Sequence, residues 1–234
     1  MKMNKLLLSI CFSLLALTGN AALAKGEAPA VYLDAAQLDS TRFMAPPPPA
    51  EVAGKEIELM LELQRLRTPE QAARSVADLE QSVFRFADVM GPKFTEQGLP
   101  LVAAFFKRLY KTESGFNKQG KELWKRERPP VVDKRLQPVA KYSHSGSYPS
   151  GHAAFGFLTG MALADMVPEW RPQILARARE FGDNRVLGGV HYPSDVEAGR
   201  QLAVLIAALA PQNPSYRADF EAAKAELRRV LELP

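Results

Sequence analysis

From position 52 onward, hydrophobic residues recur every three or four positions, which is the spacing of amphipathic α-helices. Proline and glycine mark where these runs start and stop, as at Thr68-Pro69 and Gly91-Pro92. The pattern predicts helices over 52–68, 76–90, from 100 past 109, 114–128, 150–166, 171–181, 193–210 and 216–231. No alternating strand pattern, internal repeat or 18-residue apolar stretch is present. We therefore expect an all-α, single-domain helical bundle spanning residues 51–234.

The N-terminus has the pattern of a secretory signal peptide. Lys2 and Lys5 precede an apolar run from Leu6 to Leu17, and Ala22-Leu23-Ala24 supplies small residues for cleavage. The apolar run is shorter than the ~20 residues that a membrane span requires. We expect residues 1–24 to be removed on export, which predicts a periplasmic protein.

A proline-bearing leader is expected over residues 25–50, ending in four consecutive prolines at 46–49. Such a run favours extended polyproline II structure, so the leader is interpreted as a strap rather than a core element.

Charge and cysteine content limit the function classes. The whole chain has a net charge of +4 and a sequence pI near 9.2, but cleavage would remove two lysines and no acidic residue. No concentrated basic face is present, so a nucleic-acid partner is not expected. The single cysteine, Cys11, leaves with the signal peptide. The mature chain must therefore be stable without disulfides.

The first candidate site segment is KELWKRERPP, residues 121–130. Lys121 and Arg128 are seven residues apart, so on one continuous helix they would share a face. A solvated basic surface is the alternative interpretation.

The second segment is YPSGHAA, residues 148–154, which leads into an apolar helix. Ser150 can cap that helix, and Gly151 lets the backbone approach a ligand closely. The first-turn N–H groups and the positive end of the helix would then form an anion site beside His152. A capped helix with an incidental histidine is the alternative.

The third segment is NRVLGGVHYPSDVEAGR, residues 184–200. Asp195 follows His191 by four residues and can accept a hydrogen bond from one imidazole nitrogen, which leaves the other available as a nucleophile or base. Arg185 adds a guanidinium suited to phosphate oxygens. Taken singly, each residue also has an ordinary structural explanation.

Together these segments combine two histidines, three cations and a helix N-terminus, which is what a phosphoryl group with spreading negative charge requires. Zinc is the competing use of histidine. The mature sequence has no thiol and no H-E-x-x-H motif, so no metal site is predicted.

The order and spacing Lys121-x6-Arg128-Pro129, Pro149-Ser150-Gly151-His152 and Arg185-x5-His191-x3-Asp195 resemble the three-part signature of the type 2 phosphatidic acid phosphatase superfamily, which includes the vanadium haloperoxidases. The exported all-α chain with its leader MAPPPPA is more narrowly similar to the class A bacterial non-specific acid phosphatases. The resemblance implies the vanadium haloperoxidase-like acid phosphatase fold.

The resemblance also implies roles for individual residues. His191 would be the nucleophile that forms a phosphohistidine, Asp195 would orient it, and His152 would be the general acid and base. Phosphate oxygens would be held by Lys121, Arg128, Ser150, Gly151 and Arg185. No cofactor is implied, and vanadate is expected to bind as a phosphate analogue.

Three positions fall outside the signature. Asn184 stands where the family usually has Ser, which suggests a tuned site, and Ala153 follows His152 where Thr is frequent. His144 matches no part of the signature, and we expect it to have no chemical role.

These observations predict a periplasmic, metal-independent acid phosphatase that releases inorganic phosphate from varied monoesters. Three alternatives stay open: a vanadate-dependent haloperoxidase, a phosphatase acting on diphosphates or lipids, and a non-catalytic phosphate-binding protein. No membrane partner is expected. Substrate preference, phosphotransferase activity and oligomeric state cannot be read from the sequence, although similar proteins are often homo-oligomers.

Overall fold

The computed structural model describes residues 31–234, so the expected signal peptide and the first part of the leader lie outside the described residues. Within 31–234 the chain forms helices and no strand, which confirms the all-α fold class. The helices are α1 (Ala50–Leu66), α2 (Pro69–Ala77), α3 (Ala87–Met90), α4 (Pro100–Trp124), α5 (Pro129–Val132), α6 (Gly151–Met166), α7 (Arg171–Leu187), α8 (Pro193–Leu209) and α9 (Pro214–Val230). Short 3-10 turns lie at Ser40–Phe43, Val83–Phe86, Pro168–Trp170 and Ala210–Gln212.

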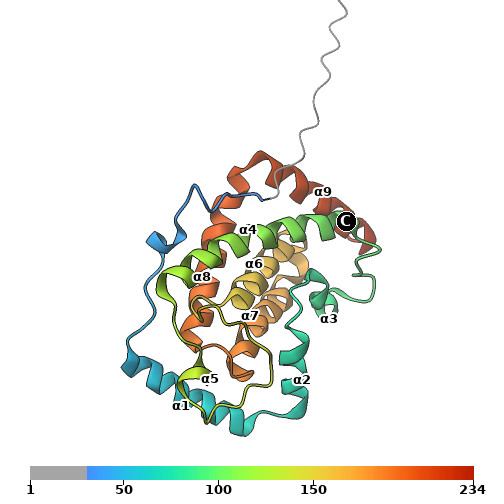
Figure 1. Ribbon diagram of the computed structural model, residues 1–234. Coiled ribbons are helices and arrows are strands. Elements are labelled where there is room, and N and C mark those ends of the chain that lie inside the picture. Colours follow the sequence, from blue (N-terminus) through green and yellow to red (C-terminus); the bar gives the residue numbers. More distant parts are fainter. Residues whose placement is uncertain (1–30) are drawn as a thin grey trace, which may run out of the picture.

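Helix α6 is the centre of the molecule (Figure 1). It is apolar around most of its circumference, as expected of a buried helix, and it packs mainly against α7 and α8. Glycines set how close these helices come. A Cβ on Gly156 would lie 2.4 Å from Cβ of Phe181, and one on Gly160 would lie 2.3 Å from Cβ of Ala178. Larger residues at these positions would push α6 and α7 apart.

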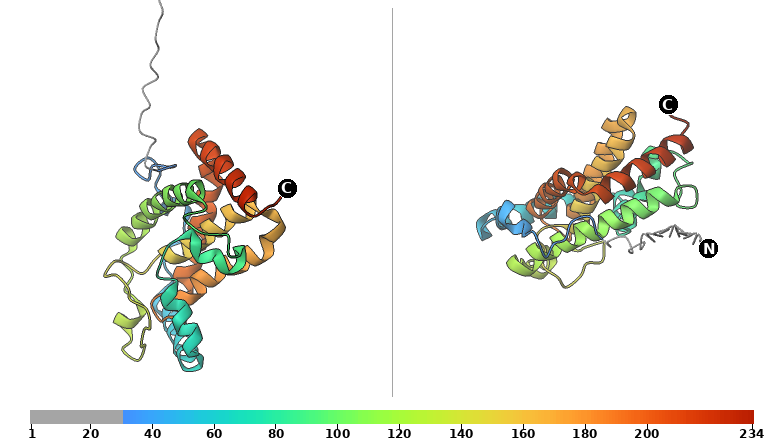
Figure 2. Two further views of the ribbon diagram at one scale, coloured as in Figure 1. Left: turned by 90° about the vertical axis from the view of Figure 1, so that its right-hand side faces the viewer. Right: turned by 90° about the horizontal axis from the view of Figure 1, so that it is seen from above.

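The remaining helices cover this centre. Helix α9 lies along α4, and the two can be followed side by side when the molecule is viewed from above (Figure 2). Helix α1 packs against α7 and contributes Ile57 and Met60 to a smaller apolar cluster with Val186 and Tyr192. Because Val186 and Tyr192 belong to the third sequence segment, this cluster anchors that segment against α1.

Several predicted boundaries were wrong. Residues 100–124 form one helix rather than two, and it ends at Lys125, whose backbone is left-handed with φ 47°. Arg128 therefore lies beyond the helix and does not share a helical face with Lys121. The predicted helix 76–90 is instead the end of α2, a turn and the short α3, because the buried carboxylate of Asp78 binds side chains of α7.

Two further differences concern length and burial. Helix α7 continues beyond Phe181 to Leu187 and so carries Arg185, and the short helix α5 (Pro129–Val132) lies where no helix was predicted. In the leader, the side chain of Tyr32 is buried in the main core, where its ring packs against those of Phe105 and Tyr216. The leader therefore contributes to the core as well as crossing the surface.

Candidate active site

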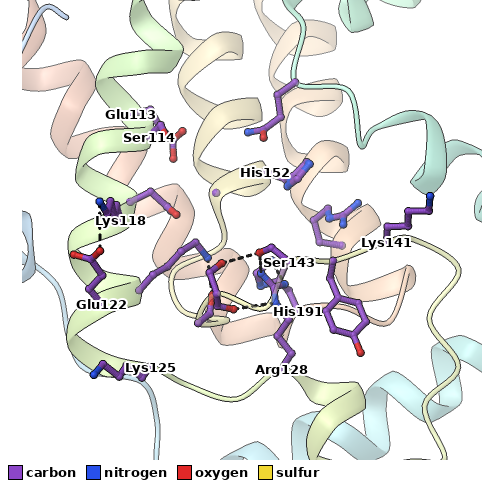
Figure 3. A pocket seen from close by; sticks show the side chains of 18 of the residues that line it. Glu113, Ser114, Lys118, Glu122, Lys125, Arg128, Lys141, Ser143, His152 and His191 are labelled. Carbon is purple, nitrogen blue, oxygen red and sulfur yellow. Dashed lines mark hydrogen bonds and ion pairs between the residues drawn. The ribbon is translucent and has the colours of Figure 1, made fainter.

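A pocket of about 760 Å³ opens between α4, the loop 141–146, and the ends of α6 and α7 (Figure 3). It brings together six of the eight residues predicted from the sequence: Lys121, Arg128, Gly151, His152, Arg185 and His191. The other two, Ser150 and Asp195, are fully buried behind its wall. The three distant sequence segments therefore converge on one site.

His191 lies just before α8, and the turn that leads into this helix brings Asp195 next to the imidazole ring. Its Nδ1 lies 3.2 Å from Oδ2 of Asp195, as the four-residue spacing predicts. Its Nε2 lies 3.0 Å from Nη1 of Arg128. A guanidinium can only donate hydrogen bonds, so Nε2 must accept and the proton must reside on Nδ1. Burial holds the pKa of His191 well below its usual value, so a neutral imidazole presents a lone pair at Nε2.

Asp195 is a buried carboxylate that is fully supplied with donors. It accepts hydrogen bonds from His191, from the Tyr192 backbone N–H at 3.0 Å, from Nη1 of Arg126 at 2.7 Å and from the Ser147 hydroxyl. Burial alone would raise the pKa of Asp195, but the hydrogen bonds and the Arg126 charge bring it below its usual value. Asp195 is therefore an anion that fixes the imidazole.

Arg126 and Ser147 were not singled out by the sequence analysis. Arg126 lies flat on the Tyr192 ring, 3.7 Å from its centroid, and also forms an ion pair with Glu56 at 3.1 Å. Ser147 reaches both His191 and Asp195. Arg126 belongs to the same basic run as Arg128, so that run does not form a solvated face; it supplies both sides of the His191–Asp195 pair.

The three predicted cations line one pocket, where Arg128 and Arg185 are buried and Lys121 is half-buried. Burial, assisted by repulsion from Arg128, lowers the pKa of Lys121 to about 8 and that of Arg185 to about 10. Nζ of Lys121 donates to the carbonyls of Gly146 and Pro149 at 2.8 and 2.9 Å. Nε of Arg185 has no hydrogen-bond partner among residues 31–234. Buried cations that repel one another are stabilised by a bound anion.

The N-terminus of α6 forms the adjoining wall. Ser150 caps the helix as predicted, with its hydroxyl 3.4 Å from the backbone N of Ala153. The start of the helix is held tightly: a Cβ on Gly199 would lie 2.4 Å from the Ser150 carbonyl oxygen. A Cβ on Gly151 would lie 3.2 Å from Oδ1 of Asn117. The backbone at Gly151 is therefore open to the pocket only because no side chain is present there.

His152 follows in the first turn of α6. Its Nε2 lies 3.2 Å from the carbonyl oxygen of Leu79, which can only accept, so Nε2 carries a proton and Nδ1 is the nitrogen that titrates. Burial, together with the charge of Arg185, lowers the pKa of His152 to about 3. In the absence of an anion His152 is therefore neutral at mildly acidic pH.

Two residues noted in the sequence lie away from the reacting groups. Nδ2 of Asn184 donates to Asp78 at 2.8 Å, so Asn184 faces the α2–α7 contact and not the pocket. His144 is exposed and does not line the pocket. Within residues 31–234, no three His, Cys, Asp or Glu side chains are grouped so as to hold a metal ion.

The sequence profile of the PAP2 superfamily matches residues 102–219. The chain belongs to this superfamily. The match contains all three sequence segments and confirms the resemblance on which their interpretation rested.

Relatives over most of the chain are acid phosphatases. The chain is 28% identical over 211 residues to a non-specific acid phosphatase of Providencia stuartii, covering 85% of each chain. It is 29% identical over 205 residues to an acid phosphatase of Zymomonas mobilis, covering 82% of this chain and 76% of that one. Among solved structures, a transmembrane PAP2 type phosphatidylglycerolphosphate phosphatase from Bacillus subtilis matches 69% of this chain and 85% of its own, with 20% identity and a TM-score of 0.49. Within residues 31–234, no helix combines the length and apolarity needed to cross a membrane.

Proposed function

We propose that the protein is a periplasmic, non-specific acid phosphatase that hydrolyses phosphate monoesters through a phosphohistidine at His191. The observation that carries the proposal is the tautomer of His191: the lone pair of Nε2 accepts a hydrogen bond from the pocket residue Arg128, while Nδ1 is held by Asp195. This is the form that an imidazole nucleophile requires. The acid phosphatase relatives support the substrate class, and the signal-peptide pattern expected at 1–24 supports the location.

In the first step, the phosphate of the ester binds among Arg128, Arg185, Lys121 and the backbone N–H at Gly151. Nε2 of His191 attacks phosphorus, and the bond between phosphorus and the ester oxygen breaks. His152 gives the proton of Nδ1 to the leaving oxygen, so an alcohol departs. Asp195 balances the positive charge that develops on His191.

In the second step, His152 is neutral and accepts a proton from water. The oxygen of that water attacks phosphorus, and the bond between phosphorus and Nε2 breaks. Inorganic phosphate leaves and His191 returns to its starting form. The cations stabilise the spreading charge in both steps, which is the work that a metal ion performs in other phosphatases. Vanadate is expected to bind to the same groups as the phosphate.

Phosphate release from a chromogenic monoester, measured at acidic pH with and without EDTA, tests the proposal. Turnover that is unaffected by EDTA, together with a phosphohistidine trapped by acid-free denaturation, is the expected result. Loss of turnover with EDTA and its restoration by zinc would show that the reaction depends on a metal. Bromide oxidation by the vanadate-loaded protein without phosphatase turnover would favour the haloperoxidase alternative.

A further inference from the structure

Glu113 is a buried acidic group in the pocket wall that the proposed reaction does not use. Its side chain lines the pocket from α4 and is only 1% exposed. Oε1 has no hydrogen-bond partner among residues 31–234. Leaving a buried carboxyl oxygen unpaired is unfavourable, and a ligand that bonds to it could remove that cost.

The helix contacts place Glu113 at the level of the proposed general acid. Further along α4, Asn117 faces Gly151 of α6, and one turn before Glu113 the ring of Tyr110 packs on Phe155, with centroids 5.6 Å apart. Glu113 lies between these contacts on α4, and His152 lies between them on α6. Figure 3 shows both in the upper part of the view, with His191 and Arg128 below them.

The phosphate and its leaving group therefore occupy different parts of the pocket. Arg128 and His191 hold the phosphate end, and His152 delivers a proton to the ester oxygen. A group attached to that oxygen would extend along the wall that contains Glu113. Tyr110 and Gln81 continue this wall and share a hydrogen bond, with Oη of Tyr110 3.2 Å from Oε1 of Gln81.

The chemistry of Glu113 indicates what this part of the pocket can bind. Burial raises the pKa of Glu113 to about 8, although the nearby charge of Lys121 opposes the shift. The carboxyl group is therefore neutral at the acidic pH at which the enzyme would work. A neutral carboxylic acid has one O–H donor and further acceptor capacity, so it can pair with an alcohol as both donor and acceptor.

We propose that Glu113 is a specificity-determining residue that binds a hydroxyl group of the leaving alcohol, so that the enzyme favours monoesters of polyols over esters of simple alcohols. The proposal rests on the phosphatase function and on the assignment of His152 as the proton donor. The expected ligands are glycerol-type and sugar-type phosphates, in which a hydroxyl lies next to the ester-bearing carbon.

Three substrates with a two-carbon leaving group test which group Glu113 recognises: 2-hydroxyethyl phosphate, ethyl phosphate and 2-aminoethyl phosphate. Phosphate release under steady-state conditions at acidic pH gives kcat/KM for each. Because a neutral hydrogen bond contributes about 0.5–1.5 kcal/mol, we expect 2-hydroxyethyl phosphate to exceed ethyl phosphate by about 3- to 10-fold. Ethyl phosphate turnover tests the phosphatase function separately from the preference.

Two variants assign the preference to Glu113. Glu113→Met keeps the length of the side chain without a polar group and should reduce the preference for 2-hydroxyethyl phosphate over ethyl phosphate to about one. Glu113→Gln keeps a donor and an acceptor, is close to isosteric and should retain part of the preference. Ser114→Ala, at the exposed neighbouring position on the pocket rim, is the matched control and should behave as the parent protein.

Four results would overturn the proposal. The Glu113→Met variant could retain the full preference, or it could lose turnover equally with all three substrates, which would indicate a general role. A preference for 2-aminoethyl phosphate that both variants abolish would mean that a charged carboxylate binds an ammonium group. Absence of turnover with every substrate in the parent protein would reject the phosphatase function itself.

Discussion

Two buried carboxylates mark two regions of the same pocket. At its phosphate end, Asp195 is fully buried and accepts hydrogen bonds from His191, Arg126, Ser147 and the backbone at Tyr192. On the α4 wall, Glu113 is equally buried, but its Oε1 has no partner among residues 31–234. The hydrogen bonds and the Arg126 charge lower the pKa of Asp195 against burial, whereas burial raises the pKa of Glu113 to about 8.

The difference shows that donors, rather than burial, decide whether a carboxylate in this pocket is charged. Around Asp195 every group is already engaged, so the region is preorganised to hold one imidazole in one tautomer. Around Glu113 the hydrogen-bonding capacity is left open. A network in which every hydrogen-bonding group has a partner can hold one side chain in a fixed position. A group without a partner can bind leaving groups of different structure.

The largest expected effect comes from the phosphate end. His191→Ala removes the proposed nucleophile, so we expect kcat for a chromogenic monoester to fall by at least about 10⁴-fold. His144→Ala is the matched control, because His144 is exposed and outside the pocket, and it should leave kcat unchanged. Substantial turnover by the His191→Ala variant would mean that the nucleophile is misassigned.

The same isosteric change in both carboxylates tests the comparison directly. Asp195→Asn places an amide N–H against groups that all donate, so we expect kcat to fall by about 10²- to 10⁴-fold and unfolding free energy to fall by about 2–4 kcal/mol. Glu113→Gln disturbs no hydrogen bond at Oε1 and should change kcat for ethyl phosphate by less than about 3-fold.

Steady-state kinetics and denaturant unfolding of the two variants measure these effects. Similar losses in both would remove the distinction between a completed and an open network. A small loss at Asp195 alone would show that the tautomer of His191 is fixed by Arg128 without help from the carboxylate.

The sequence predicted the features that depend on residues close together in the chain and not those that depend on contacts between distant residues. His191 and Asp195 are one helical turn apart, and Ser150, Gly151 and His152 form one helix start, so local spacing was enough to find them. The predicted helix boundaries were wrong where contacts between distant residues determine where a helix ends. Asp78 ends α2 by binding Arg177, which lies 99 residues later. Nothing near Asp78 in the sequence indicates that partner.

Glu113 was missed although the sequence contains a signal for it. It lies in a lysine-rich stretch that is typical of a surface, yet it follows Leu109 by four residues and precedes Phe116 by three, and both of these are buried on α4. An acidic residue on the apolar face of a helix is the pattern to examine. Two helices were predicted over this stretch, whereas one helix, α4, runs through it, and its Gly120 is required by packing: a Cβ there would lie 2.6 Å from Pro149 Cδ.

A third prediction concerns proton uptake at the phosphate end. Burial and the neighbouring cations hold the pKa of His152 near 3 in the free site, and a bound dianion should raise it. Between the free and bound pKa values the complex holds one more proton than the free protein. Affinity for a dianion should therefore increase as pH falls, by up to about tenfold per unit.

Inorganic sulfate is a suitable probe because its charge does not change between about pH 4 and 7. Calorimetry in two buffers of different ionisation enthalpy should detect uptake of up to one proton per bound sulfate. His152→Asn should bind sulfate without this uptake, which separates His152 from Lys121, whose pKa near 8 acts at higher pH. Equal uptake by the variant would assign the proton to another group.

The smallest effect on the folded protein is expected at the Glu113 carboxyl and is measured as a change in stability with pH. The pKa of Glu113 is raised from 4.5 to about 8 in the folded protein, so between these values the folded state keeps a proton that the unfolded state has lost. Stability is therefore expected to decline as pH rises from about 4.5 to 8. Glu113→Gln does not titrate, so it should match the parent protein near pH 4 and exceed it near pH 8 by at least about 1 kcal/mol, or about 2–4 °C in Tm.

Thermal unfolding of both proteins across this pH range measures the difference. Glu122→Gln is the matched control on the same helix, because Glu122 is exposed and only loosely paired with Lys118 at 3.5 Å. Its effect on the free energy of unfolding should stay below about 0.5 kcal/mol throughout this range. If Glu113→Gln gains no stability as pH rises, Glu113 is ionised in the folded protein. Glu113 and Asp195 would then differ in their hydrogen bonds but not in their charge.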